Sequence, residues 1–127
     1  MNPGTGKASA GIVSTRNSEH YEWGARCGGW HLLKSPGLSV IQEQVPAGAG
    51  ELRHYHQRAE QFFYVLSGVA ALEVEGEEHV LHMGQGLHVA AGKAHRLTNR
   101  HSQALNFLVI STPPSHGDRI DLEGRAD

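Results

Sequence analysis

Three histidines stand at positions from which their rings could reach one metal ion. His54 and His56 are two residues apart, so on an extended strand both rings lie on the same face. His95 belongs to a later segment, where it follows the predicted turn at Gly92. Because neutral imidazole is a common ligand of transition metals, the three residues together predict a metal site.

The strands that would carry these histidines are short and closely spaced. The chain has 127 residues, among them 16 glycines and 5 prolines, which is enough for one domain with a core and too short for two ordinary ones. No stretch has the apolar repeat of a long helix, so we predict an all-β antiparallel barrel. The predicted strands are residues 30–34, 38–45, 51–56, 61–67, 69–75, 78–82, 87–90, 94–99 and 104–111.

Composition argues against several classes of partner. The formal net charge is −2, and no cluster of Lys and Arg alternates with aromatic residues, which argues against nucleic acid. No apolar segment approaches the length of a membrane span, and the start lacks the apolar core of a signal peptide, so we expect a cytoplasmic protein. Cys27 is the single cysteine and cannot form an internal disulfide. A small molecule is the expected partner.

Two segments of the chain resemble the two motifs of the cupin superfamily. The first motif is matched by Gly48, His54, His56, Glu60 or Gln61, and Gly68. The second is matched by Gly84, Gly92, His95 and Asn99, with Ala90 where the family usually has proline. Residues 61–68 read Gln-Phe-Phe-Tyr-Val-Leu-Ser-Gly, a run similar to that of small bacterial single-domain cupins.

The resemblance implies a double-stranded β-helix, the jelly-roll or cupin barrel, which is usually a homodimer with a metal held inside one end. His54, His56 and His95 match three of the family's ligands. We expect a flexible arm over residues 1–19, one barrel over 20–115 and a C-terminal tail over 116–127 that lies on the outside. Motif one spans residues 48–68 and motif two spans 84–99.

The fourth ligand departs from the family pattern, because two residues compete for it. The usual spacing back from Gly68 reaches Gln61, whereas the carboxylate is at Glu60. Alternation along the strand places Gln61 on the inner face with Phe63 and Val65, and turns Glu60 outward unless a bulge re-aims it. We therefore favour Gln61. An amide brings no charge, so a divalent metal would keep its full charge and favour an anionic ligand.

Three histidines with open coordination resemble the sites of cupin dioxygenases, and this resemblance favours a small-molecule metalloenzyme of oxygenase-like type that acts on a small organic acid or ring compound. Its cofactor would be a divalent transition metal, namely Fe, Zn, Ni, Cu or Mn. A non-catalytic binding or sensing cupin, a metal-dependent isomerase or lyase, and a metal-free pocket are the alternatives. No catalytic residue can be named, because no general base is evident unless Glu60 turns inward.

Two further expectations concern the barrel interior. On the strand at residues 38–45, we consider a face that carries Val40, Gln42 and Gln44, with Gln42 as a candidate pocket residue. Six other histidines have no ligand spacing to the two motifs, so we expect each to be exposed or to lie at a strand end: His31, His79, His82, His88, His101 and His116.

Overall fold

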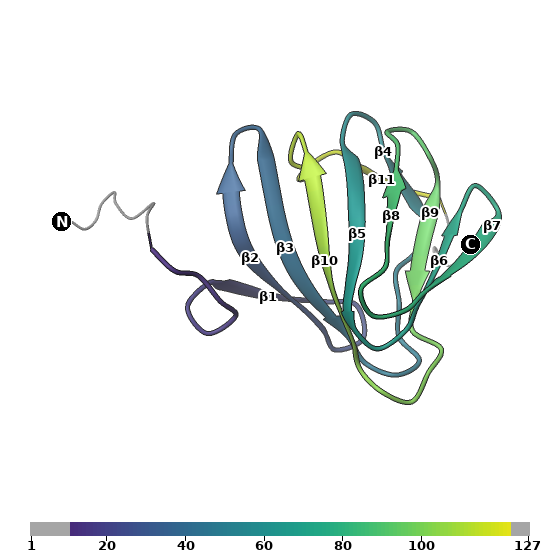
Figure 1. Ribbon diagram of the computed structural model, residues 1–127. Coiled ribbons are helices and arrows are strands. Elements are labelled where there is room, and N and C mark those ends of the chain that lie inside the picture. The colour runs from purple at the N-terminus through teal and green to yellow at the C-terminus, as the bar shows by residue number, and fades with distance from the viewer. Residues whose placement is uncertain (1–10, 123–127) are drawn as a thin grey trace.

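The computed structural model describes residues 11–122, and these residues form two antiparallel β-sheets without helix (Figure 1). Residues 1–10 of the predicted arm and residues 123–127 of the predicted tail lie outside the described residues. The strands are β1 (Glu19–Trp23), β2 (Cys27–Ser35), β3 (Leu38–Val45), β4 (His54–His56), β5 (Glu60–Ser67), β6 (Ala70–Val74), β7 (Glu77–Leu81), β8 (Gly86–Val89), β9 (His95–Thr98), β10 (Leu105–Thr112) and β11 (Arg119–Asp121).

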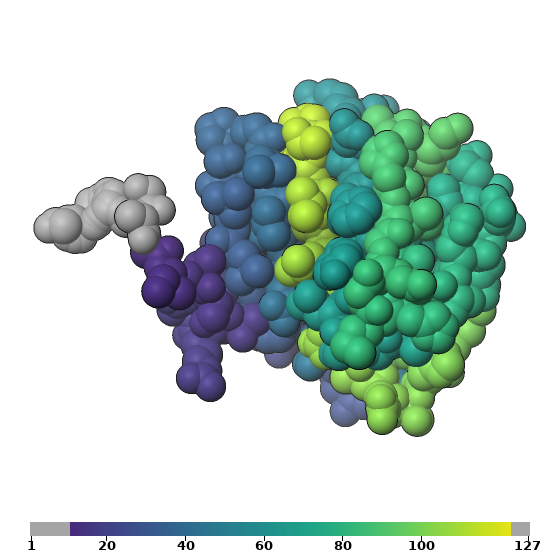
Figure 2. Space-filling view, viewed as in Figure 1, coloured from purple at the N-terminus to yellow at the C-terminus, as the bar shows by residue number. Residues whose placement is uncertain are grey.

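The two sheets face each other as the halves of a jelly-roll barrel. One has six strands in the order β1-β2-β3-β10-β5-β8, and the other has five in the order β11-β4-β9-β6-β7. β10 lies between β3 and β5, although it comes some forty residues or more after them in the sequence. Figure 2 shows β10 as a yellow stripe on the outer surface. The predicted all-β, double-stranded β-helix fold is confirmed. No helix within residues 11–122 is long and apolar enough to cross a membrane.

Side-chain alternation explains how the strands enclose a core. Along β5, Gln61, Phe63 and Val65 are buried, while Phe62 and Tyr64 between them are exposed, because successive side chains point to opposite faces of a sheet. The interior is filled mainly by apolar side chains from both sheets. Its largest fully buried apolar members are Phe63, Phe107, Leu72, Leu97 and Leu105.

The structure differs from the sequence prediction at the first strands. The first predicted strand began at residue 30, but β2 begins at Cys27 and so includes Gly28 and Gly29. A turn lies just before β2, where Gly24 and Arg26 have φ angles of 56° and 63°. β1 was not predicted because its sequence, Glu-His-Tyr-Glu-Trp, buries little surface and lacks a clear alternation.

The segment that follows β10 also differs from the expectation of a tail lying outside the barrel. β11 pairs with β4, so that Arg119 lies opposite His56 and Asp121 opposite His54. The carboxylate of Asp118 is buried and accepts backbone N–H groups of Gln57, Arg58 and Ala59 at 3.2, 2.9 and 2.9 Å. These bonds tie the segment to the loop that separates β4 from β5.

Replacing the motif glycine Gly68 by alanine should destabilise the fold more than the same change at Gly76. Both glycines have positive φ, 87° and 86°, which costs an alanine about 1–2 kcal/mol. A Cβ on Gly68 would in addition lie 2.7 Å from the carbonyl oxygen of Ala104, whereas nothing is within 4 Å at Gly76. We expect Gly68→Ala to lose about 3 kcal/mol or more in urea unfolding. Equal losses for the two variants would contradict this account.

Candidate metal centre

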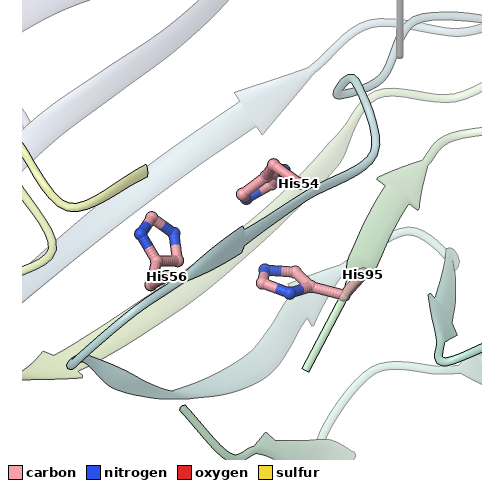
Figure 3. A group of neighbouring side chains, drawn as sticks. All are labelled: His54, His56 and His95. Carbon is pink, nitrogen blue, oxygen red and sulfur yellow. The ribbon is translucent and has the colours of Figure 1, made fainter. Parts of the chain in front are cut away.

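The three predicted histidines come together inside the barrel. His54 and His95 are opposite each other where β4 pairs with β9, and His56 lies on the same face of β4 as His54 (Figure 3). Their exposed fractions are 2%, 1% and 6%. One ring nitrogen from each lies within 4.8 Å of the others. The arrangement could therefore hold a metal ion.

Backbone carbonyls fix the rings of His54 and His95. Nδ1 of His54 is 2.7 Å from the carbonyl oxygen of Leu52, and Nδ1 of His95 is 3.0 Å from that of Lys93. A carbonyl oxygen only accepts, so each Nδ1 carries the proton and donates it. Each neutral ring then keeps its lone pair on Nε2, which is the form that binds a metal.

Burial keeps these rings neutral. Loss of hydration lowers the pKa of His54 to about 3 and that of His56 to about 4, with the neighbouring imidazoles adding to the effect. The pKa of His95 is also lowered, chiefly by burial. Neutral imidazoles at physiological pH are ready to donate their lone pairs without first losing a proton.

The strand alternation predicted for Gln61 and Glu60 is seen in the structure. Gln61 is 7% exposed and faces the interior, where its Nε2 donates to the hydroxyl of Ser111 at 3.0 Å. Glu60 points outward, and its carboxylate is 2.7 Å from Nε2 of His88 in an exposed pair. Gln61 is thus on the same side of the strand as the buried core, and coordination by its oxygen stays a prediction.

Unpartnered polar atoms are the best test of whether a metal fits here. Within residues 11–122, Oε1 of Gln61, Nδ1 of His56 and Nε2 of His95 are buried without a hydrogen-bond partner. A buried polar atom without a partner is costly, and lone pairs grouped in this way are stabilised by a cation. Nitrogen donors with one amide oxygen suit a divalent transition metal better than Mg²⁺ or Ca²⁺.

A cavity of about 260 Å³, which we call the inner cavity, opens beside His54, His56 and Gln61. Two carboxylates, Glu43 and Glu51, also line it. Glu43 accepts a hydrogen bond of 2.6 Å from the hydroxyl of Tyr21, and Glu51 accepts one of 3.0 Å from the backbone N–H of Leu97. Two acidic groups therefore line the same cavity as the histidines. Either could act as the general base that was not evident from the sequence.

Burial makes both carboxylates hold protons more tightly than usual. It raises the pKa of Glu43 to about 7 against the opposing effects of Tyr21 and Arg119. It raises the pKa of Glu51 to about 8, and the charge of Glu43 adds to the shift. Each group can therefore accept or release a proton near neutral pH, which is the property of a general acid or base.

Glu43 was not predicted as a site residue, because the face of β3 that was expected to line the pocket is the outer one. Val40, Gln42 and Gln44 do not line the cavities, and Ile41 and Glu43 do. The apolar residues Ile41 and Val45 could have indicated the inner face. Val45 is fully buried, and Glu43 lies between these two residues on the same face of the strand. The prediction that Gln42 lines the pocket is therefore wrong.

Tyr21 reaches Glu43 from β1 because Gly29 leaves room for its ring. A Cβ on Gly29 would lie 2.2 Å from Cζ of Tyr21, so a larger residue there would displace the ring. Tyr21 also borders a second, outer cavity of about 550 Å³. The two cavities share Tyr21, Ile41, Ser115 and His116 as lining residues.

The C-terminal segment supplies site residues that were expected to lie elsewhere. His116 is exposed, as predicted, yet it lines both cavities. Arg119 lines the inner cavity from β11. Neither residue carries a sequence signal, because only the pairing of β11 with β4 brings this segment to the histidines.

Comparisons with known proteins identify the family. A family model described as cupin domain matches residues 41–111, which include the three histidines and Gln61. An uncharacterized protein of Methanocaldococcus jannaschii is 28% identical over 94 residues, 73% of this chain and 75% of that protein. Quercetin 2,3-dioxygenase of Bacillus subtilis is 32% identical over 72 residues, 55% of this chain and 21% of that protein.

A solved structure supports the fold over a longer stretch. The polyketide cyclase RemF of Streptomyces resistomycificus superposes with a TM-score of 0.78 at 16% identity, covering 92% of this chain and 88% of that one. At this identity the likeness concerns the fold alone. With its barrel, its two glycine- and histidine-bearing motifs and the matching family model, the chain belongs to the cupin domain family.

Proposed function

We propose that the protein is a metal-dependent small-molecule enzyme of oxygenase-like type that acts on a small organic acid or ring compound. The observation that carries this proposal is the grouping of three buried imidazoles and an unpartnered amide oxygen beside a cavity. His54, His56, His95 and Gln61 would hold a divalent transition metal. The similarity to a quercetin dioxygenase, a protein named for a ring compound, agrees with this reaction class.

In this proposal, side chains of the cavity orient the substrate and remove a proton from it. A bound metal would supply Lewis-acid or redox chemistry at an oxygen atom of the substrate. Glu43 or Glu51 takes the proton from a substrate hydroxyl, and the hydroxyl of Tyr21 holds the Glu43 carboxylate in place. Phe63 and Val109 form an apolar wall of the inner cavity and limit the access of water to the reacting group.

The sizes of the cavities favour a substrate with more than a few atoms. The inner cavity of about 260 Å³ is smaller than most ligand sites, while the outer cavity of about 550 Å³ falls within their usual range. The cavities adjoin, because they share lining residues. We expect a substrate that places a polar group beside the histidines and a ring beyond Tyr21.

A metal-dependent isomerase or lyase is the second candidate, and the pair Glu43 and Glu51 is what favours it. Two carboxylates that titrate near neutral pH can move a proton between neighbouring atoms of a substrate without any oxidant. The fold-level likeness to a polyketide cyclase is compatible with such chemistry.

Oxygen uptake distinguishes the two candidates. Protein loaded with Fe²⁺ should consume dioxygen when supplied with quercetin or with a 2-hydroxy acid such as mandelate, whereas Zn²⁺-loaded protein should not, since Zn²⁺ has no redox chemistry. Product formation by the Zn²⁺ protein would favour the isomerase or lyase. Tight binding without any turnover would contradict both and favour a non-catalytic binding protein.

Exchanging the two adjacent candidates for the fourth ligand tests the metal set. Gln61→Glu should tighten Zn²⁺ binding about 10-fold or more, equal to ~1.4 kcal/mol, because a carboxylate adds a negative charge to the site. Gln61→Ala should weaken binding, and His95→Ala should abolish it. The matched control Glu60→Ala should bind as the wild type does, since Glu60 points outward. Competition titration with a chelating dye measures all four, and identical affinities for the wild type and both Gln61 variants would exclude coordination by Gln61.

The stability of the metal-free protein should depend on pH through Glu51. Its pKa is about 8 in the folded protein against an ordinary 4.5, so the folded state holds a proton that the unfolded chain releases. Between about pH 5 and pH 8, rising pH therefore removes stability from the wild type. The melting temperature of Glu51→Gln relative to the wild type should rise across this range. The exposed Glu60→Gln should follow the wild type, and a constant difference for Glu51→Gln would refute the raised pKa.

A further inference from the structure

Arg119 is the permanently charged cation among the described residues that line the inner cavity. It lies opposite His56 in the pairing of β11 with β4. The other charged or titratable side chains of that lining are the two carboxylates, Tyr21 and histidines. A guanidinium stays charged at any physiological pH and presents a planar set of donors that matches a carboxylate.

The guanidinium of Arg119 keeps donors for a ligand. Within residues 11–122 its side chain makes one hydrogen bond, from Nε to Oδ1 of Asp121 at 2.7 Å. This bond orients the group and leaves its two terminal amino groups for another partner. A bidentate contact through such amino groups is the usual way in which arginine recognises a carboxylate.

The charge of Arg119 is felt throughout the candidate metal centre. It contributes to the lowered pKa values of His54, His56 and His95, and it opposes the raised pKa values of Glu43 and Glu51. Arg119 lines the same cavity as His54 and His56, so a ligand group between them would lie in that cavity.

The fold fixes the backbone that carries Arg119. Its neighbour Asp118 is buried, and the three backbone N–H groups that it binds fix the start of β11 to residues 57–59. Those residues lie between His56 and Gln61 in the sequence, so the same loop positions the candidate ligands and the arginine. A binding residue on such a fixed element loses little freedom when it meets its ligand.

We propose that Arg119 binds the carboxylate of the substrate, and that the substrate is a hydroxy or oxo acid whose second oxygen faces the histidines. This inference rests on the proposed function and selects organic acids from the two classes given there. A singly charged carboxylate suits the cavity better than a phosphate, because Glu43 and Glu51 line the same cavity and each, once it is ionised, would repel a second negative charge. The remainder of a larger acid extends past Tyr21 into the outer cavity.

A charged probe and its neutral analogue test this assignment. Mandelate and mandelamide have the same ring and hydroxyl and differ in the carboxylate. Calorimetry with Zn²⁺-loaded protein should show that Arg119→Gln weakens mandelate binding roughly 10-fold or more and leaves mandelamide binding unchanged. Arg119→Lys, which keeps the charge but not the fork, should give an intermediate loss. Arg100→Gln removes an exposed arginine that pairs with Glu78 and does not line the inner cavity, and it should bind both probes as the wild type does.

The outcomes separate this inference from the proposed function. Zinc content measured by mass spectrometry should be the same in the wild type and in all three variants, and a wild type that holds no zinc would overturn the proposed function. Normal zinc content with equal mandelate affinity in the wild type and Arg119→Gln, or with no mandelate binding by the wild type, would overturn the role of Arg119 alone. Circular dichroism confirms that each variant is folded.

Discussion

The pairing of β4 with β9 is the constraint on which the candidate metal centre depends. It sets His54 opposite His95 and so joins two sequence motifs that lie on separate strands of the five-stranded sheet. A shift of one residue in this register would turn His95 outward and bring Arg96 to the interior. The backbone carbonyls of Leu52 and Lys93 then decide which nitrogen of each ring is free. Strand register brings the three histidines together, and the ring tautomer leaves Nε2 of His54 and of His95 free to bind a metal.

The sequence predicted the features that follow from local pattern. The two-residue spacing of His54 and His56 and the inward alternation of Gln61 and Phe63 required only the period of a β-strand. The predicted turn at Gly92 followed from conformational preference, and this glycine has a φ angle of 83°. Glu75 and Gly76 form the turn between β6 and β7, with φ angles of 51° and 86°. These features were predictable because the physics that fixes them acts within a few residues.

The features that were missed depend on contacts between distant segments. Glu43 faces the cavity because it lies on the same face of β3 as Val45. This face could be identified as the inner one only by recognising Val45 as a core residue. Tyr21 depends on a gap that Gly29 leaves in the neighbouring strand. Arg119 depends on Asp118 and its bonds to a loop some sixty residues earlier in the chain. This segment contains prolines, and its anchors are a buried carboxylate and the three-residue strand β11, so the sequence was interpreted as a tail.

The uncharged residue at position 61 is best understood together with Glu43 and Glu51. A glutamate at 61 would place a third carboxylate in a cavity of about 260 Å³ that already holds two, and mutual repulsion would raise their pKa values further. With Gln61 the negative charge lies on groups that titrate near neutral pH and are free to exchange protons. A metal held by neutral donors keeps its full positive charge and attracts an anion. The amide at 61, the two titrating carboxylates and the fixed arginine thus describe one consistent site for an acidic substrate.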